Sequence, residues 1–150
     1  MIKYDEIKNI IKIIEECSAV ALTFYKQKHL EVSIKDDNSP VTKADLEISR
    51  IATNKLSEMF PNDKIISEEN ITNLNEVDMT KYWLIDPIDG TKEFITKSGF
   101  FTINFALISN NKPVFGIICQ PTTSSIWFNN NNKAYKIKKT YNILDAKELK

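Results

Sequence analysis

The chain has 150 residues, which is enough for one domain with a hydrophobic core. Its 42% hydrophobic and 27% charged residues are ordinary for a globular protein, and 20 basic residues balance 20 acidic ones. This balance argues against a nucleic-acid-binding protein, because no global positive field attracts a phosphate backbone, so an anionic substrate would have to be held locally.

The cysteines and the hydropathy pattern predict where the protein works. Cys17 and Cys119 lie far apart in apolar contexts, with neither a disulfide framework nor a metal-type spacing, which predicts buried free thiols and a reducing compartment. No apolar run approaches the ~20 residues that a membrane span needs. The N-terminus lacks the basic start and apolar core of a signal peptide. We therefore expect a cytoplasmic protein without a membrane span.

The first part of the chain predicts two helices. Apolar residues recur at spacings of three and four from about residue 4 to residue 28, the pattern of an amphipathic helix. Residues 35–40 are polar and rich in turn formers, which predicts a surface loop. Thr42 is the expected N-cap of a second helix, and Asp45 three residues later gives an acidic version of the capping box.

The rest of the chain predicts a sheet. Glu68 and Glu69 follow a short strand, residues 70–81 form a polar surface excursion, and the next strand is expected to stop at Pro87. Short turns then force later strands into an antiparallel meander packed against the two helices. These later strands are residues 102–108, 114–119, 125–128 and 134–137, with residues 129–132 as a hairpin tip. The predicted fold class is α+β, with one domain over residues 1–150: two N-terminal helices packed on a mainly antiparallel sheet.

The chain is organised around the end of the strand that begins near residue 82. Asp86 and Asp89 are three residues apart, so one turn of chain can aim both carboxylates at one point. Gly90 permits unusual backbone dihedrals, and its N–H and that of Thr91 favour an anion if Thr91 opens a helical turn. Carboxylates suit Mg²⁺ and amides suit a phosphate, although such a turn alone is ordinary turn chemistry. The acidic pair that begins at Glu68 distinguishes this turn from an ordinary one.

These motifs together resemble a known family. Residues 86–91 (DPIDGT) resemble the signature of the inositol monophosphatase-like, lithium-sensitive, Mg²⁺-dependent phosphatases. Three further matches stand in the expected order: residues 39–45 (SPVTKAD), 66–69 (ISEE) and 101–104 (FTIN). The continuation, TKEFI, is more similar to the 3'(2'),5'-bisphosphate nucleotidase branch, since the inositol branch usually has Thr and Asn at Lys92 and Glu93. The resemblance implies removal of the 3'-phosphate of 3'-phosphoadenosine 5'-phosphate or its sulfated relative, and hence a role in sulfur metabolism.

The resemblance also implies roles for single residues. The Mg²⁺ ligands would be Glu68, Asp86, Asp89 and the backbone carbonyl of Ile88, with Asp86 bridging two metals. Gly90 and Thr91 would cradle the phosphate, so these six residues form the expected substrate-binding set.

The implied catalytic pair is Asp45 and Thr91. Asp45 would accept a hydrogen bond from the Thr91 hydroxyl, and Thr91 would orient the attacking water. Two alternatives stay open: Asp45 can be only a helix cap, and Glu69 competes with Glu68, which is favoured as the first of the pair in the family pattern.

The resemblance covers only the N-terminal half of the layered inositol monophosphatase-like fold. Relatives continue into an α/β half with a further Asp in a Trp-Asp motif, whereas Trp127 here precedes Phe128. We therefore expect a metal- and phosphate-binding domain without the C-terminal half, with weaker Mg²⁺ binding and an exposed apolar patch. A homodimer or the missing half would cover that patch. Open alternatives are inositol monophosphatase activity on a sugar-alcohol phosphate, a non-catalytic metal- and phosphate-binding fragment, and a structural interaction module.

Overall fold

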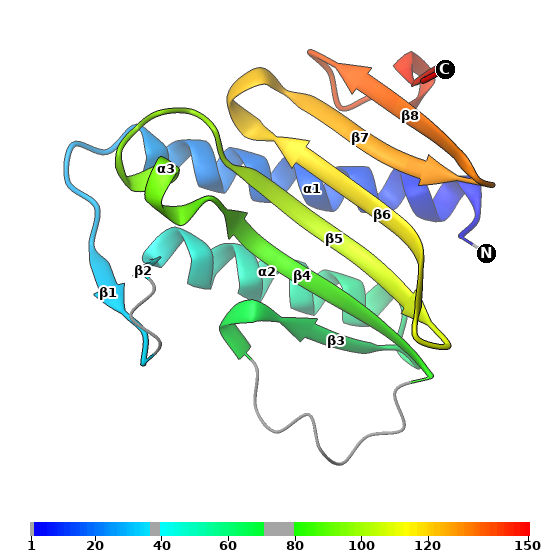
Figure 1. The fold of residues 1–150 in the computed structure, drawn as a ribbon, viewed down its shortest axis with the longest axis horizontal. Coiled ribbons are helices and arrows are strands. Elements are labelled where there is room, and N and C mark those ends of the chain that lie inside the picture. Colours follow the sequence, from blue (N-terminus) through cyan, green and yellow to red (C-terminus); the bar gives the residue numbers. More distant parts are fainter. Residues whose placement is uncertain (1, 37–39, 71–79) are drawn as a thin grey trace.

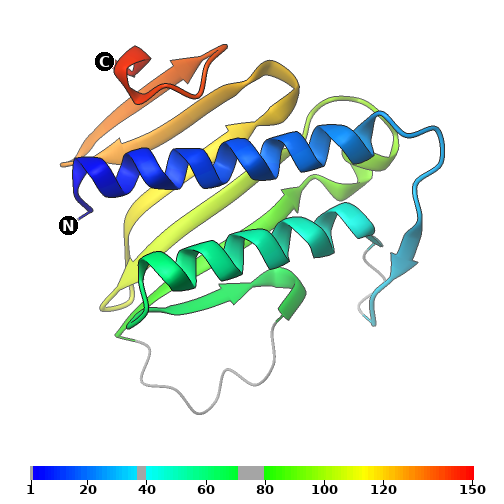
Figure 2. The same ribbon diagram turned by 180° about the vertical axis from the view of Figure 1, so that it is seen from behind.

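Two long helices cover one face of a seven-stranded sheet in the computed structural model, which describes residues 2–36, 40–70 and 80–150 (Figures 1 and 2). Residues 37–39 of the predicted loop (35–40) and residues 71–79 of the predicted excursion (70–81) lie outside the described residues. The helices are α1 (Tyr4–Tyr25) and α2 (Lys43–Met59), with a short α3 (Thr91–Ile95). The main sheet contains β3 (Lys64–Ser67), β4 (Lys81–Asp89), β5 (Thr102–Ser109), β6 (Lys112–Gln120), β7 (Ser125–Asn130), β8 (Lys133–Lys138) and β9 (Lys147–Glu148). A separate hairpin pairs β1 (Val32–Ile34) with β2 (Pro40–Thr42), and 3-10 turns form η1 (Glu68–Asn70), η3 (Pro121–Thr123) and η4 (Ile143–Asp145).

The order of the main sheet follows the chain from β3 to β9, as the short turns predict. The β3–β4 pair is parallel, and every other pair in this sheet is antiparallel. The turn from β7 to β8 places Asn131 and Asn132 at φ of 50° and 61°, the left-handed backbone that such a tight hairpin needs. The prediction of an α+β fold with two helices on a mainly antiparallel meander is confirmed.

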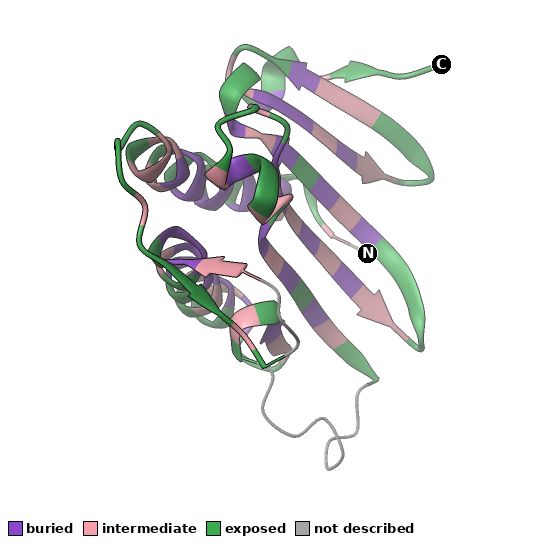
Figure 3. Cartoon of the chain, turned by 60° about the vertical axis from the view of Figure 1, so that its left-hand side comes forward, coloured by how far each residue is buried: buried purple, intermediate pink, exposed green. Residues whose placement is uncertain are grey.

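Alternation along the strands separates the two faces of the sheet. Trp83 and Ile85 on β4 are buried against the helices, and Trp83 stacks on Phe60 with ring centroids 5.1 Å apart. Their neighbour Leu84 is 40% exposed, and Ile118 on β6 is 46% exposed. Figure 3 shows how the burial class changes from residue to residue along the strands. Burial of each large apolar side chain contributes about 1.5–3 kcal/mol, so the covered face fixes the position of β4. The opposite face keeps the apolar patch that the sequence predicts.

Two element boundaries differ from the predictions. Helix α1 ends at Tyr25 instead of residue 28. Strand β4 does not stop at Pro87 but continues to Asp89. The pairing register shifts there: Asp86 faces Asn104, and three residues later Asp89 faces Thr102. Since the extra residue forms a bulge, Pro87 is tolerated although it lacks an N–H for the ladder.

Candidate active site

Three acidic segments meet at one end of the sheet. Because β3 and β4 are parallel, their carboxyl ends lie at the same edge, which places Glu68 beside the end of β4. Helix α2 begins at this edge and carries Asp45 in its first turn (Figure 1). The fold therefore brings together the acidic residues that the sequence singled out.

Asp45 is a buried helix cap. Its Oδ2 accepts hydrogen bonds from the Thr42 backbone N–H, at 2.8 Å, and from the Thr42 hydroxyl, which confirms the predicted capping box. The residue is only 2% exposed. Burial raises the pKa of the Asp45 carboxyl above its ordinary value, while the two bonds from Thr42 work in the opposite direction.

Glu68 and Glu69 point into different surroundings, although they are adjacent in η1. The Glu69 side chain is 6% exposed, whereas that of Glu68 is 49% exposed. Lys35 Nζ contacts both, at 3.1 Å from Glu68 Oε1 and 2.7 Å from Glu69 Oε1. Burial raises the pKa of Glu69, and the bonds from Lys35 oppose that rise. Burial lowers the pKa of Lys35, but its bonds to Glu69 and Glu68 outweigh this and raise it overall.

Asp86 carries the strongest electrostatic strain of the site. Burial, followed by the charges of Glu68, Asp89 and Asp45, raises its pKa from 3.8 to about 7. Its Oδ1 atom is buried and has no hydrogen-bond partner within the ranges that the structure describes. A bound cation would relieve the repulsion and satisfy this oxygen, and hard carboxylate oxygens are the ligands that Mg²⁺ prefers.

The four acidic side chains are neighbours without forming a ready metal centre. No group of three His, Cys, Asp or Glu side chains within residues 2–36, 40–70 and 80–150 is close enough to hold an ion. The charges of Glu68, Asp89 and Asp45 nevertheless all raise the pKa of Asp86, which places these carboxylates in its electrostatic neighbourhood. Mutual repulsion and the engagement of Glu68 by Lys35 both favour this open arrangement.

The turn after β4 places the backbone groups of the site. Gly90 has φ of +91°, and a Cβ atom there would lie 3.0 Å from the Phe100 carbonyl oxygen, so the position requires glycine. Thr91 opens α3, and its hydroxyl donates to the Ile88 carbonyl at 3.1 Å. The expected bond from this hydroxyl to Asp45 is therefore not the one made. The local bond spans three residues of the bulged turn, while both Thr42 donors occupy Asp45 Oδ2.

Two residues at the site were not assigned a role from the sequence. Asn104 lies opposite Asp86 on β5, and its Nδ2 donates to Asp89 Oδ2 at 3.0 Å. It belongs to one of the matched motifs, which was the available signal. Lys35 was placed in a surface loop, but its side chain is only 23% exposed. Its partners are 33 and 34 residues away, so no local pattern reveals the contact.

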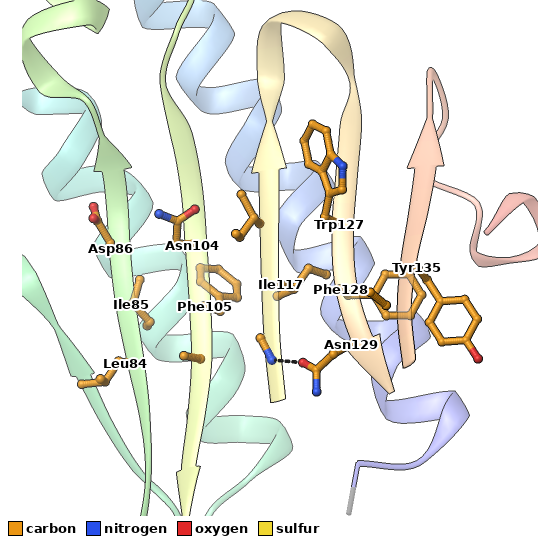
Figure 4. Close-up of a pocket in the computed structure, with 14 residues that line it drawn as sticks. Leu84, Ile85, Asp86, Asn104, Phe105, Ile117, Trp127, Phe128, Asn129 and Tyr135 are labelled. Atoms are coloured by element: carbon orange, nitrogen blue, oxygen red, sulfur yellow. Dashed lines mark hydrogen bonds between the residues drawn. The ribbon is translucent and has the colours of Figure 1, made fainter. Parts of the chain in front are cut away.

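An apolar groove of about 530 Å³ begins at the site and crosses the open face of the sheet (Figure 4). Asp86 and Asn104 lie side by side at one end of the groove (Figure 4). Leu84, Ile118 and Trp127 supply apolar surface, and the Asn129 side chain accepts a hydrogen bond from the Gly116 N–H at 2.6 Å. The acidic site and the groove are therefore continuous.

Comparison with known proteins identifies the family. The family model described as "Inositol monophosphatase family" matches residues 3–148. The chain belongs to the inositol monophosphatase family.

Relatives within the inositol monophosphatase family include nucleotidases. The 3'(2'),5'-bisphosphate nucleotidase CysQ of Haemophilus influenzae is 38% identical over 126 residues, covering 83% of this chain and 47% of the relative. The enzyme of that name from Escherichia coli K12 is 34% identical over 134 residues, covering 86% and 54%. The crystal structure of CysQ from Bacteroides thetaiotaomicron superposes with a TM-score of 0.79 at 28% identity, covering 95% of this chain and 56% of that one. The chain thus spans about half the length of the relatives it matches.

The prediction of buried free thiols is confirmed. Both Cys17 and Cys119 are free and buried, and burial raises the pKa of each thiol to about 12. Within the described segments, we find no helix with the length and apolar character required to cross a membrane.

Proposed function

We propose that this chain is the metal- and phosphate-binding part of a Mg²⁺-dependent phosphomonoesterase of the 3'(2'),5'-bisphosphate nucleotidase type. The observation that carries the proposal is Asp86, whose pKa is raised to about 7 among neighbouring carboxylates and whose buried Oδ1 has no partner in the described chain. Such a group gains most from a divalent cation. Membership of the inositol monophosphatase family supports this reading independently.

The proposed metal ligands are Glu68, Asp86, Asp89 and the carbonyl oxygen of Ile88. Every donor is a hard oxygen, which fits Mg²⁺. Between the two glutamates, Glu68 is favoured because it interacts with Asp86, whereas Glu69 is buried against Lys35. When bound, Mg²⁺ would lower the pKa of a water molecule and offset the negative charge of the phosphate.

The phosphate and the attacking water would be bound and oriented by Thr91, Gly90 and Asp45. Gly90 keeps the backbone free of a side chain at the turn, so that a phosphate can approach its N–H and that of Thr91. The Thr91 hydroxyl, which donates to the Ile88 carbonyl, would turn to a bound water and orient it. Asp45 is held by Thr42 with a raised pKa, which suits a group that takes up a proton.

The proposed substrate is 3'-phosphoadenosine 5'-phosphate, with inositol monophosphate as the alternative. Nucleotidase names among the relatives and the TKEFI continuation at residues 91–95 support the nucleotide. We also propose a cytoplasmic protein, which the two free thiols support. Phosphate release from both substrates, with Mg²⁺ and with EDTA, tests the proposal. Faster release from inositol monophosphate would overturn the substrate preference, and EDTA-insensitive release would overturn the metal site.

A second candidate is a metal- and phosphate-binding module that needs further polypeptide for turnover. Coverage of about half of each relative and the open apolar groove favour it. That groove would then be covered by a second copy or by the half that the relatives have in addition. Mg²⁺ binding without phosphate release from either substrate would support this candidate over the enzyme.

A further inference from the structure

One lysine ties the N-terminal hairpin to the acidic site. Lys35 directly follows β1, and its Nζ contacts Glu69 Oε1 at 2.7 Å and Glu68 Oε1 at 3.1 Å. Its side chain is 23% exposed, compared with 60% for Lys43, whose partner Glu31 is also exposed. The ion pairs that Lys35 forms with Glu68 and Glu69 therefore lie in a partly buried environment. A charge-assisted bond is stronger there than on the open surface.

The Lys35 ammonium contacts the carboxylate of Glu68, which is one of the proposed metal ligands. Glu68 is the charge that acts most on Asp86, and Lys35 sits on its Oε1 atom. A divalent cation that coordinates Glu68 would compete with the Lys35 ammonium for the same carboxylate and would also be repelled by it. Glu69 is more deeply buried and more tightly bound to Lys35, so it would keep the lysine when Glu68 changes partner.

We propose that Lys35 is an internal competitor for the metal, which weakens cation binding at Glu68 and couples metal occupancy to the β1–β2 hairpin. This inference rests on the proposed metal-binding function. The hairpin forms its own two-stranded sheet, and all three residues of β1 are exposed. Strand β2 contacts α2 and α3, whereas Lys35, directly after β1, contacts the two glutamates of η1, and a metal on Glu68 would remove one of these two contacts.

A titration of the 150-residue chain with Mn²⁺ tests the competition, and the loss of the electron paramagnetic resonance signal of free Mn²⁺ measures binding. Lys35→Met keeps most of the stem and removes the charge. We expect it to bind Mn²⁺ about three- to tenfold more tightly than the parent, the range for one partly exposed charge-assisted bond. Lys43→Met removes the same charge from an exposed pair and should stay within about twofold of the parent.

Two further measurements separate competition from a structural role. Lys35→Arg retains the charge and both partners, so it should bind Mn²⁺ no more tightly than the parent. In hydrogen exchange, Mn²⁺ should speed exchange of the β1 amides in the parent, whereas in Lys35→Met exchange should be fast with or without the ion. If Lys35→Met binds Mn²⁺ equally or more weakly while the parent binds it, the competitor role is wrong and the metal site stands. If no variant binds Mn²⁺, the metal site and the competitor role both fail.

Discussion

Replacement of Asp86 by Asn gives the sharpest test of the acidic site, because it can be read from stability without any substrate. The raised pKa means that the folded protein resists ionisation of this carboxyl. The rise from 3.8 to about 7 corresponds to roughly 4 kcal/mol. Because Asp86 is only half-buried and solvent screens part of the repulsion, we expect about 2 kcal/mol in practice.

The sign follows from linkage. A carboxyl whose pKa is higher in the folded state contributes stability below its unfolded pKa near 4, and that stability is lost as the pH rises to about 7. Asn does not titrate, so the variant escapes this loss. Without metal at pH 8, Asp86→Asn should be more stable than the parent by about 2 kcal/mol, with a Tm roughly 4–8 °C higher. At pH 4 the two proteins should melt within about 2 °C of each other.

Thermal unfolding by circular dichroism in EDTA measures this difference. Glu15→Gln is the control, because it removes one negative charge from the exposed face of α1. It should leave the difference in Tm between pH 4 and pH 8 the same as in the parent. Addition of Mg²⁺ should raise the Tm of the parent but not that of Asp86→Asn, because the variant lacks the central ligand. An Asp86→Asn protein that is no more stable than the parent at pH 8 would refute the strained-carboxylate argument.

Two more substitutions test the turn that follows β4. Gly90→Ala should cost about 1–3 kcal/mol in urea unfolding, because φ is +91° and a backbone carbonyl lies 3.0 Å from the added Cβ. Gly116→Ala is the control, since its nearest heavy atoms are 3.8 Å away, and an equal loss in both would contradict the reasoning. Thr91→Val should lower phosphate release by about 10²-fold or more while Mg²⁺ affinity changes little, and Thr91→Ser should restore release. Full activity in Thr91→Val would remove the hydroxyl from the mechanism.

Features that depend on near neighbours were predictable from the sequence. The capping box formed by Thr42 and Asp45 spans three residues, and the hairpin at Asn131 and Asn132 is determined by its own dihedrals. The acidic residues could be located because each stands at the end of a strand or helix. The rule that a proline ends a strand fails at Pro87, because the pairing of β4 with β5 continues past it.

Contacts between distant segments could not be predicted. The bond of Lys35 to η1 joins segments more than 30 residues apart and crosses from the hairpin to the main sheet. The partner of the Thr91 hydroxyl depends on the bulge in β4, which turns the Ile88 carbonyl toward it. In both cases a polar group has several acceptors within reach, and only the packed fold selects one.

The open face of the sheet connects the acidic site with association of the chain. Ile117 and Ile118 are adjacent on β6, but Ile117 is fully buried against the helices and Ile118 is 46% exposed in the groove. Ile118→Thr should therefore change the free energy of unfolding by less than about 1 kcal/mol, whereas Ile117→Thr should cost about 2–4 kcal/mol. If the groove is a docking surface, Ile118→Thr should also reduce concentration-dependent association in sedimentation velocity, because apolar area is the driving force. A parent chain that stays monomeric at high concentration would show that the exposed groove does not drive self-association.

Any surface that covers the groove also reaches Asp86 at its end, and further burial makes an unpaired carboxylate more costly. Cation binding at Asp86 would offset that cost, so occupation of the metal site and closure of the groove should favour each other.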